Sequence, residues 1–107
     1  MAFYIKRNDT SPILNATLKD GDGAAVDLAG TSVALKMKAV NDTSLKVDSA
    51  CTIVDASNGK VRYTWVAADT NARGSYQAEF QVTYSGGAIE TFPNDGYVSI
   101  IITDDLS

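Results

Sequence analysis

The sequence predicts an all-β sandwich of about seven to nine antiparallel strands without a disulfide. The main observation is the segment 74–84, where apolar and polar residues alternate strictly from Tyr76 to Tyr84. A period of two places one apolar row on one face of an extended strand, whereas a helix would scatter those side chains around its circumference. Turn-forming residues also recur about every 8–12 residues, and no long helical pattern interrupts them. Cys51 is the only cysteine, so no intrachain disulfide can form.

The first part of the chain predicts three amphipathic strands and one short return. Residues 8–12 form a dense turn cluster, and Pro12, which has no N–H, is expected at the start or the edge of a strand. Residues 20–23, Asp-Gly-Asp-Gly, predict a hairpin turn because Gly and Asp tolerate a positive φ. The expected strands and the return cover residues 3–6, 13–19, 33–38 and 26–28.

The second part predicts further strands separated by clear turns. The pattern from Leu45 to Asp55 is less regular, and we expect a strand around 51–54. Asn58-Gly59 is the most specific hairpin signal in the chain. Residues 67–73 are the only plausible helical fragment, a single turn capped by Asp69 or Thr70. The remaining strands are expected at 61–65, 74–84, 88–92 and 97–103.

Size and composition narrow the class of protein. The chain has 107 residues, which fits a single domain spanning 1–107, and 45% of them are hydrophobic. The net charge is −4 with no basic cluster, so nucleic acid is not expected as a partner. No stretch approaches the apolar length of a membrane span, and the N-terminus does not read as a secretory signal. We therefore expect no membrane partner and synthesis in a reducing cytoplasm.

The residue types argue against an enzyme. The chain has no histidine, which removes the usual nucleophile–histidine systems and imidazole metal sites. Asp20, Asp22 and Asp27 lack the remaining ligands of a calcium loop, so a turn is the better interpretation. Glu79 and Glu90 are expected to face solvent rather than a cleft, and 104–105 to form a solvated tail. We expect no catalytic residue, no metal and no cofactor.

The aromatic residues fall into two groups. The first lies on rows expected to face inward and is interpreted as core: Tyr63, Trp65, Tyr76, Phe80 and Tyr84. The second flanks strand ends and forms either an apolar assembly patch or filler at the end of the core: Phe3, Tyr4, Phe92 and Tyr97. Ile101 adds an apolar side chain on the outer face of the last strand, which is apolar on both faces. The predicted assembly contacts are Phe3, Tyr4, Phe92, Tyr97 and Ile101.

Residues 74–76, Gly-Ser-Tyr, resemble the tyrosine corner of immunoglobulin-like sandwiches, in which a tyrosine hydroxyl bonds to backbone a few residues upstream. Ala78 stands where the second cysteine of an antibody domain would be. The predicted fold is therefore an immunoglobulin-like β-sandwich without the disulfide.

Several segments together resemble the N-terminal domain of phage baseplate upper proteins. They occur in order, with compatible spacings, over nearly the whole chain: residues 3–12, 26–31, 57–65, 69–70, 74–80 and 90–94. Each segment is short, and none is a catalytic signature. The resemblance implies a non-enzymatic attachment module of a siphophage tail or baseplate.

The resemblance also implies partners and a location. Longer members carry a C-terminal extension that reaches the receptor-binding protein, whereas this sequence stops at Ser107, which favours a free-standing module of the tail, neck or capsid surface over a baseplate role. We expect it to bind other virion structural proteins in multiple copies or as a homo-oligomer, after synthesis in the host bacterial cytoplasm. The alternatives are a carbohydrate-binding adhesion module and a capsid-surface decoration protein.

Overall fold

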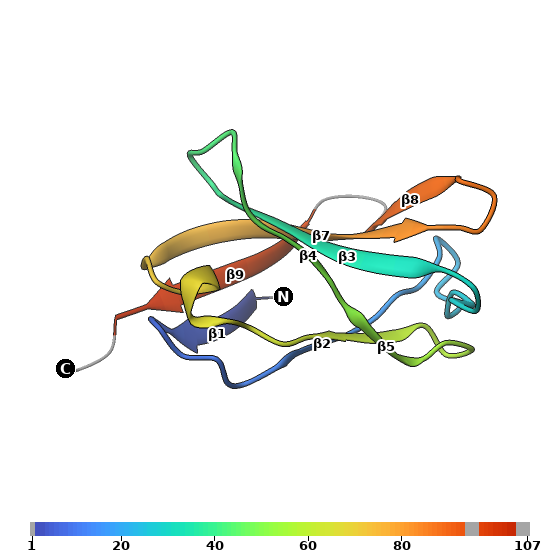
Figure 1. Cartoon of the computed structure of the whole chain (residues 1–107), viewed down its shortest axis with the longest axis horizontal. Coiled ribbons are helices and arrows are strands. Elements are labelled where there is room, and N and C mark those ends of the chain that lie inside the picture. The colour runs from blue at the N-terminus through green and yellow to red at the C-terminus, as the bar shows by residue number, and fades with distance from the viewer. Residues whose placement is uncertain (1, 94–96, 105–107) are drawn as a thin grey trace.

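The computed structural model describes residues 2–93 and 97–104, and over these residues it contains nine strands and one short 3-10 helix (Figure 1). The strands form two facing layers, as the predicted sandwich requires. The elements are β1 (Ala2–Lys6), β2 (Leu14–Thr17), β3 (Ser32–Ala39), β4 (Leu45–Ala50), β5 (Thr52–Asp55), β6 (Lys60–Tyr63), η1 (Ala67–Asp69), β7 (Gly74–Thr83), β8 (Ile89–Phe92) and β9 (Val98–Thr103).

The two sheets differ in size. The larger has the order β1-β9-β7-β3-β4, with β8 also paired to β7, and the smaller has the order β2-β6-β5. In Figure 1 the strands β3, β7, β8 and β9 of the larger sheet lie above β2 and β5. The predicted all-β sandwich is therefore confirmed.

The strand β7 is the centre of the larger sheet. On one side it pairs with β3 from Ser32↔Thr83 to Ala39↔Tyr76. On the other side β9 pairs with its first half and β8 with its second half. The apolar row that the alternation predicts is buried: Tyr76, Ala78, Phe80 and Val82.

The core fills the space between the two sheets. Trp65 is 2% exposed, and its ring lies edge-on to Tyr63 with centroids 5.1 Å apart. Its indole N–H is buried without a hydrogen-bond partner among the described residues, so Trp65 stabilises the fold through packing. The other buried hydrophobic side chains come from both layers: Ile5, Leu14, Leu18, Leu28, Val33, Leu35, Met37, Val47, Val61, Phe92, Ile100 and Ile102.

The expectation of purely antiparallel pairing was wrong for one strand. β1 pairs with β9 in parallel, from Ala2↔Ser99 to Lys6↔Thr103. The chain then crosses to the other sheet, where β2 pairs with β6. Apolar alternation gives the face of a strand and carries no information on its direction, so the sequence could not reveal this pairing.

The irregular segment from Leu45 to Asp55 contains two strands where one was expected. β4 belongs to the larger sheet and β5 to the smaller one, so the chain changes layers at Cys51. β4 is an edge strand in which only Val47 is buried, which explains why its alternation is weak. Cys51 itself is partly buried against the core, and burial raises the pKa of its thiol to about 12.

The predicted return at 26–28 is not a strand. Only an isolated bridge joins Lys19 to Ala25, and the backbone N–H of Leu28 donates to the carbonyl of Ala56 in the next layer. Leu28 is nevertheless fully buried. The segment therefore contributes to the core without joining a sheet.

The predicted hairpin turns are present. Gly59 has a φ of 66° between β5 and β6, and a Cβ at this position would lie 2.6 Å from the carbonyl oxygen of Leu18. Asp20 forms the other turn, because its Oδ1 accepts hydrogen bonds from the backbone N–H groups of Asp22 and Ala24. This carboxylate therefore stabilises the turn that was preferred over a calcium loop.

Candidate interaction surfaces

The five predicted assembly contacts divide between the surface and the core. The register Phe3↔Ile100 and Tyr4↔Ile101 places the two pairs on opposite faces of the larger sheet. Tyr4 is 65% exposed, and the half-buried Ile101 lies beside it on the outer face. Tyr97 is also exposed, immediately before β9. These three residues remain predicted contacts.

The other two residues fit the alternative of core filler. Phe92 is 2% exposed and pairs with Phe80 across β8 and β7. Phe3 is partly buried, with its ring centroid 5.8 Å from that of Trp65. Both side chains therefore lie on the inner side of the larger sheet.

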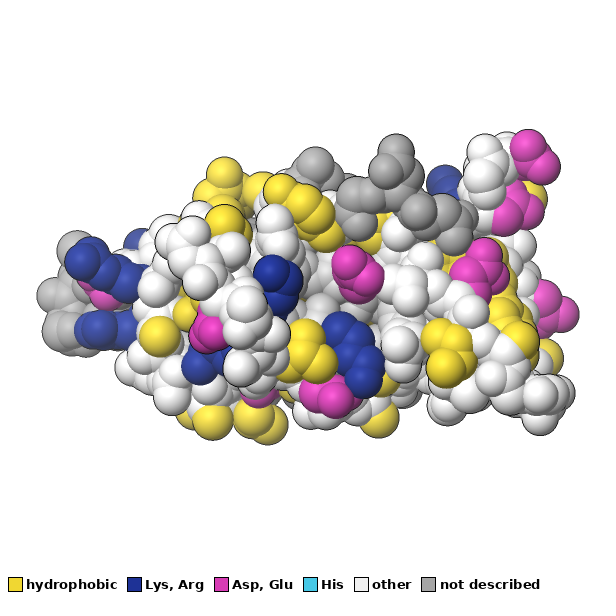
Figure 2. All heavy atoms as spheres, turned by 90° about the horizontal axis from the view of Figure 1, so that it is seen from above, with side chains coloured by type: hydrophobic (Ala, Val, Ile, Leu, Met, Phe, Trp, Pro, Cys, Tyr) yellow, Lys and Arg dark blue, Asp and Glu magenta, His cyan; other side chains and the backbone are white. Residues whose placement is uncertain are grey.

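The outer face of the larger sheet carries interspersed charges. Figure 2 shows Lys and Arg side chains next to Asp and Glu, with separate hydrophobic patches between them. One such pair joins Lys36 on β3 to Asp48 on β4. Exposed pairs of this kind contribute little to stability. Because positive and negative side chains are mixed, this face offers polar and apolar contact area rather than an electrostatic potential of one sign.

Glu90 does not face outward as expected. It pairs with Val82, which places it on the inner side of β8, and its Oε1 accepts a hydrogen bond from the Tyr84 hydroxyl at 2.7 Å. This bond is the main reason that the pKa of Tyr84 is raised. Glu79 pairs with Lys36 on the outer face, so the two glutamates lie on opposite faces of the sheet and cannot act as a catalytic pair.

Asp104 is not a free solvated tail. Its carboxylate lies 2.9 Å from Arg73 Nη1 and 3.5 Å from Arg7 Nη1, and it thereby joins the ends of β1, β7 and β9. Asp105, the other acidic residue of the predicted tail, lies outside the described residues. Because these side chains are partly exposed, each ion pair contributes little to stability. The arrangement is better explained as a link between strand ends than as a binding site.

Two buried tyrosine hydroxyls hold the connection between β6 and β7. The Tyr76 hydroxyl donates to the carbonyl of Ala72 at 2.7 Å, which confirms the predicted tyrosine corner. The Tyr63 hydroxyl donates to Asp69 Oδ2 at 2.6 Å, and the same oxygen accepts the backbone N–H of Val66 at 3.0 Å. Asp69, the last residue of η1, therefore caps the start of this turn, as predicted, by accepting the N–H of Val66, the residue before η1.

No cluster of three or more His, Cys, Asp or Glu side chains is arranged to hold a metal ion in residues 2–93 and 97–104. The same residues contain no helix that is long and apolar enough to cross a membrane.

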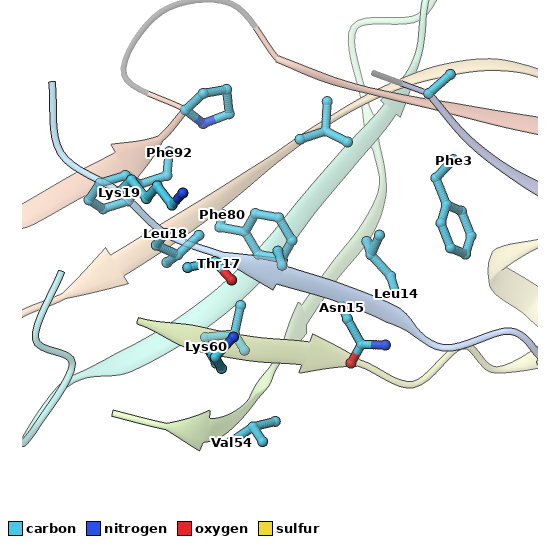
Figure 3. A pocket seen from close by; sticks show the side chains of 15 residues that line it. Phe3, Leu14, Asn15, Thr17, Leu18, Lys19, Val54, Lys60, Phe80 and Phe92 are labelled. Atoms are coloured by element: carbon cyan, nitrogen blue, oxygen red, sulfur yellow. The ribbon is translucent and has the colours of Figure 1, made fainter. Parts of the chain in front are cut away.

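A groove of about 820 Å³ opens between the two sheets on the β2 side, and the sequence did not predict it (Figure 3). Leu14 from β2 and Leu18, the residue after β2, line it together with Phe80 and Phe92 from the larger sheet. It exists because β1, the strand closest in sequence to β2, pairs with β9 in the other layer. Since this depends on the pairing of β1, no local pattern in the sequence could reveal the groove.

Comparison with known proteins identifies the family. The sequence model of the BppU N-terminal domain matches residues 3–95. This chain belongs to the BppU N-terminal domain family. The matched region covers residues 3–6 of β1 and all of β2 to β8, and therefore the smaller sheet and the larger sheet except β9. The expected resemblance to phage baseplate upper proteins is thus confirmed.

Solved structures support the fold of this BppU N-terminal domain. The N-terminal domain of phage TP901-1 ORF48 has a TM-score of 0.69 at 14% identity, over 96% of this chain and 85% of that one. CopC from Methylosinus trichosporium OB3b has a TM-score of 0.55 at 15% identity, over 98% of this chain and 86% of that one. At these identities the likeness concerns the fold alone. No curated protein matches the sequence closely enough to count as a relative.

Proposed function

We propose that this chain is a non-enzymatic structural protein of a bacteriophage virion, made in the host cytoplasm and assembled in multiple copies at the tail, baseplate or neck. The observation that carries the proposal is membership of a phage baseplate family over residues 3–95. The absence of histidine from the sequence and the separation of Glu79 from Glu90 on opposite faces are consistent with a binding role.

The mechanism we propose is binding by surface complementarity. Tyr4, on the edge strand β1 beside Ile101, and Tyr97, immediately before β9, expose large aromatic area. Aromatic side chains supply contact area at a low cost in side-chain entropy and are enriched at protein interfaces. An edge strand in addition offers unpaired backbone groups to a neighbour.

The experiment compares purified particles that carry variants of the chain. Mass spectrometry should find the wild-type chain in several copies per particle, and Tyr4→Ser should reduce incorporation. Val66→Ser is a matched control, because Val66 is similarly exposed but lies in the connection after β6. Both changes should leave stability within about 0.5 kcal/mol, as is usual for surface sites.

Absence of the wild-type chain from particles would refute the proposal. Binding of the isolated chain to a glycan array, lost in Tyr4→Ser, would instead favour the carbohydrate-binding alternative.

A further inference from the structure

The smaller sheet has an unpaired edge along β2. Within the described residues β2 pairs only with β6, in the register Leu14↔Tyr63 to Thr17↔Lys60. The backbone N–H of Leu18 donates to the carbonyl of Gly59 at 2.8 Å, on the β6 side. Because backbone groups of an antiparallel strand alternate in direction, the N–H and C=O groups of Asn15 and Thr17 point away from β6. Two donors and two acceptors therefore line the free edge.

This edge runs along the groove. Residues 14–19 all line the groove, and Val98 and Pro93 line it from the side of the larger sheet. Figure 3 shows Leu14 and Leu18 turned between the layers, with Asn15 towards the rim. A strand added beside β2 would direct every second side chain into this apolar space and the others to solvent.

The charge of the groove restricts the occupant. Lys19 and Lys60 are the charged side chains among its described lining residues, and no carboxylate lines it. Lys60 stands opposite Asp55 on β5, whereas Lys19 makes no ion pair within the described residues. Because the whole chain carries a net charge of −4, this is a locally positive site on an acidic protein. It favours a partner segment that carries carboxylates.

We propose that β2 and the groove accept an extended segment of a neighbouring virion protein, which adds a fourth strand to the smaller sheet. The segment pairs with the backbone of Asn15 and Thr17, places apolar side chains at alternate positions into the groove, and carries acidic residues near Lys19. Main-chain hydrogen bonds provide affinity, and the groove selects the side chains. The inference rests on the proposed assembly function and specifies the edge and the chemistry of the partner.

The test supplies such a segment to the full chain. An eight-residue segment in which Val alternates with Glu is fused through a flexible Gly-Ser linker to the N-terminus, because Ala2 lines the groove. Tethering raises the effective concentration of the segment to about the millimolar range, so that binding of modest affinity is still detected. A chain fused to an otherwise identical Val/Lys segment is the matched control. Hydrogen exchange of the backbone amides is measured by NMR.

The Val/Glu fusion should slow amide exchange at Asn15 and Thr17 at least ten-fold relative to the Val/Lys fusion. Thr17→Pro should abolish this protection, because it removes an N–H that points away from β6 and leaves the β2–β6 bonds intact. Lys19→Glu, which keeps every backbone group, should reduce the protection, whereas Lys46→Glu on β4 should not. Lys19→Glu keeps the test decisive if Thr17→Pro fails to fold.

Three results would overturn the proposal. They are unchanged exchange at both amides in the Val/Glu fusion, equal protection in the Lys19→Glu fusion, and protection in the untagged chain that rises with its own concentration. The last result would make a second copy the occupant. Detection of the chain in particles is independent of this edge, so failure here leaves the proposed virion function standing.

Discussion

Replacing Tyr63 with Phe removes one oxygen atom and tests how the β6–β7 connection is held. The Tyr63 hydroxyl donates to Asp69 Oδ2 at 2.6 Å, and the same carboxylate oxygen also accepts the Val66 N–H. Both Tyr63 and Asp69 are buried, at 4% and 7% exposure. Water therefore cannot easily replace the lost donor, and the carboxylate is left with one of its two hydrogen bonds.

The expected loss follows from the nature of the bond. A hydrogen bond to a charged group contributes about 1.5–3 kcal/mol to stability. We expect Tyr63→Phe to lower the free energy of unfolding by about 2 kcal/mol. For a domain of this size, ~1 kcal/mol corresponds to ~4–8 °C, so the melting temperature should fall by about 8–16 °C.

Urea unfolding followed by the fluorescence of Trp65, the only tryptophan, provides the assay. A double-mutant cycle with Asp69→Ala should give a coupling energy of about 1–3 kcal/mol between the two side chains. Tyr97→Phe, at an exposed tyrosine, should change stability by less than about 0.5 kcal/mol. A loss as small as this for Tyr63→Phe, or a coupling energy of zero, would refute the reasoning.

Three further predictions concern the core and one turn. Burial raises the pKa of Cys51 and of Tyr63, each to about 12, from 9.0 and 10.0. Both groups therefore lose their proton at a lower pH in the unfolded chain than in the folded protein. The free energy of unfolding should thus stay constant up to about pH 9 and decrease as the pH rises from there towards 12. Urea unfolding at a series of pH values should show this fall flattened in the Cys51→Ala/Tyr63→Phe variant. Trp65→Ala should lower the free energy of unfolding, measured by calorimetry, by about 3–5 kcal/mol. A Trp65→Ala variant that was fully folded and had lost only ligand binding would instead make Trp65 a site residue. Gly59→Ala should destabilise the chain more than Gly87→Ala, measured by thermal unfolding, because both have a positive φ but only Gly59 has backbone within 4 Å of the added Cβ. Equal losses at the two glycines would contradict the close contact.

The functional surfaces were less predictable than the core. Ile101 was identified because an apolar side chain on the solvent face breaks the alternation of its strand, and Tyr4 because it flanks a strand end. Phe92 is also a large apolar residue at a strand end, but its side chain lies in the core. Residue type cannot separate these cases, because the register of β8 against β7 decides which way the ring points. The groove along β2 gave no signal in the sequence, since residues distant along the chain form its two sides.

Local patterns by themselves determined the layers of this protein: which residues of β3, β7 and β9 are buried, where the turns at 20–23 and 58–59 lie, and that Tyr76 closes a corner. Each depends on side chains a few positions apart, whose preferences for burial or for a positive φ act locally. Only the tertiary structure decided that β1 runs parallel to β9, that the chain changes sheets at Cys51, and that β2 keeps a free edge. These features depend on which distant strands meet, and the free energy of that pairing is shared over many contacts that no short segment contains.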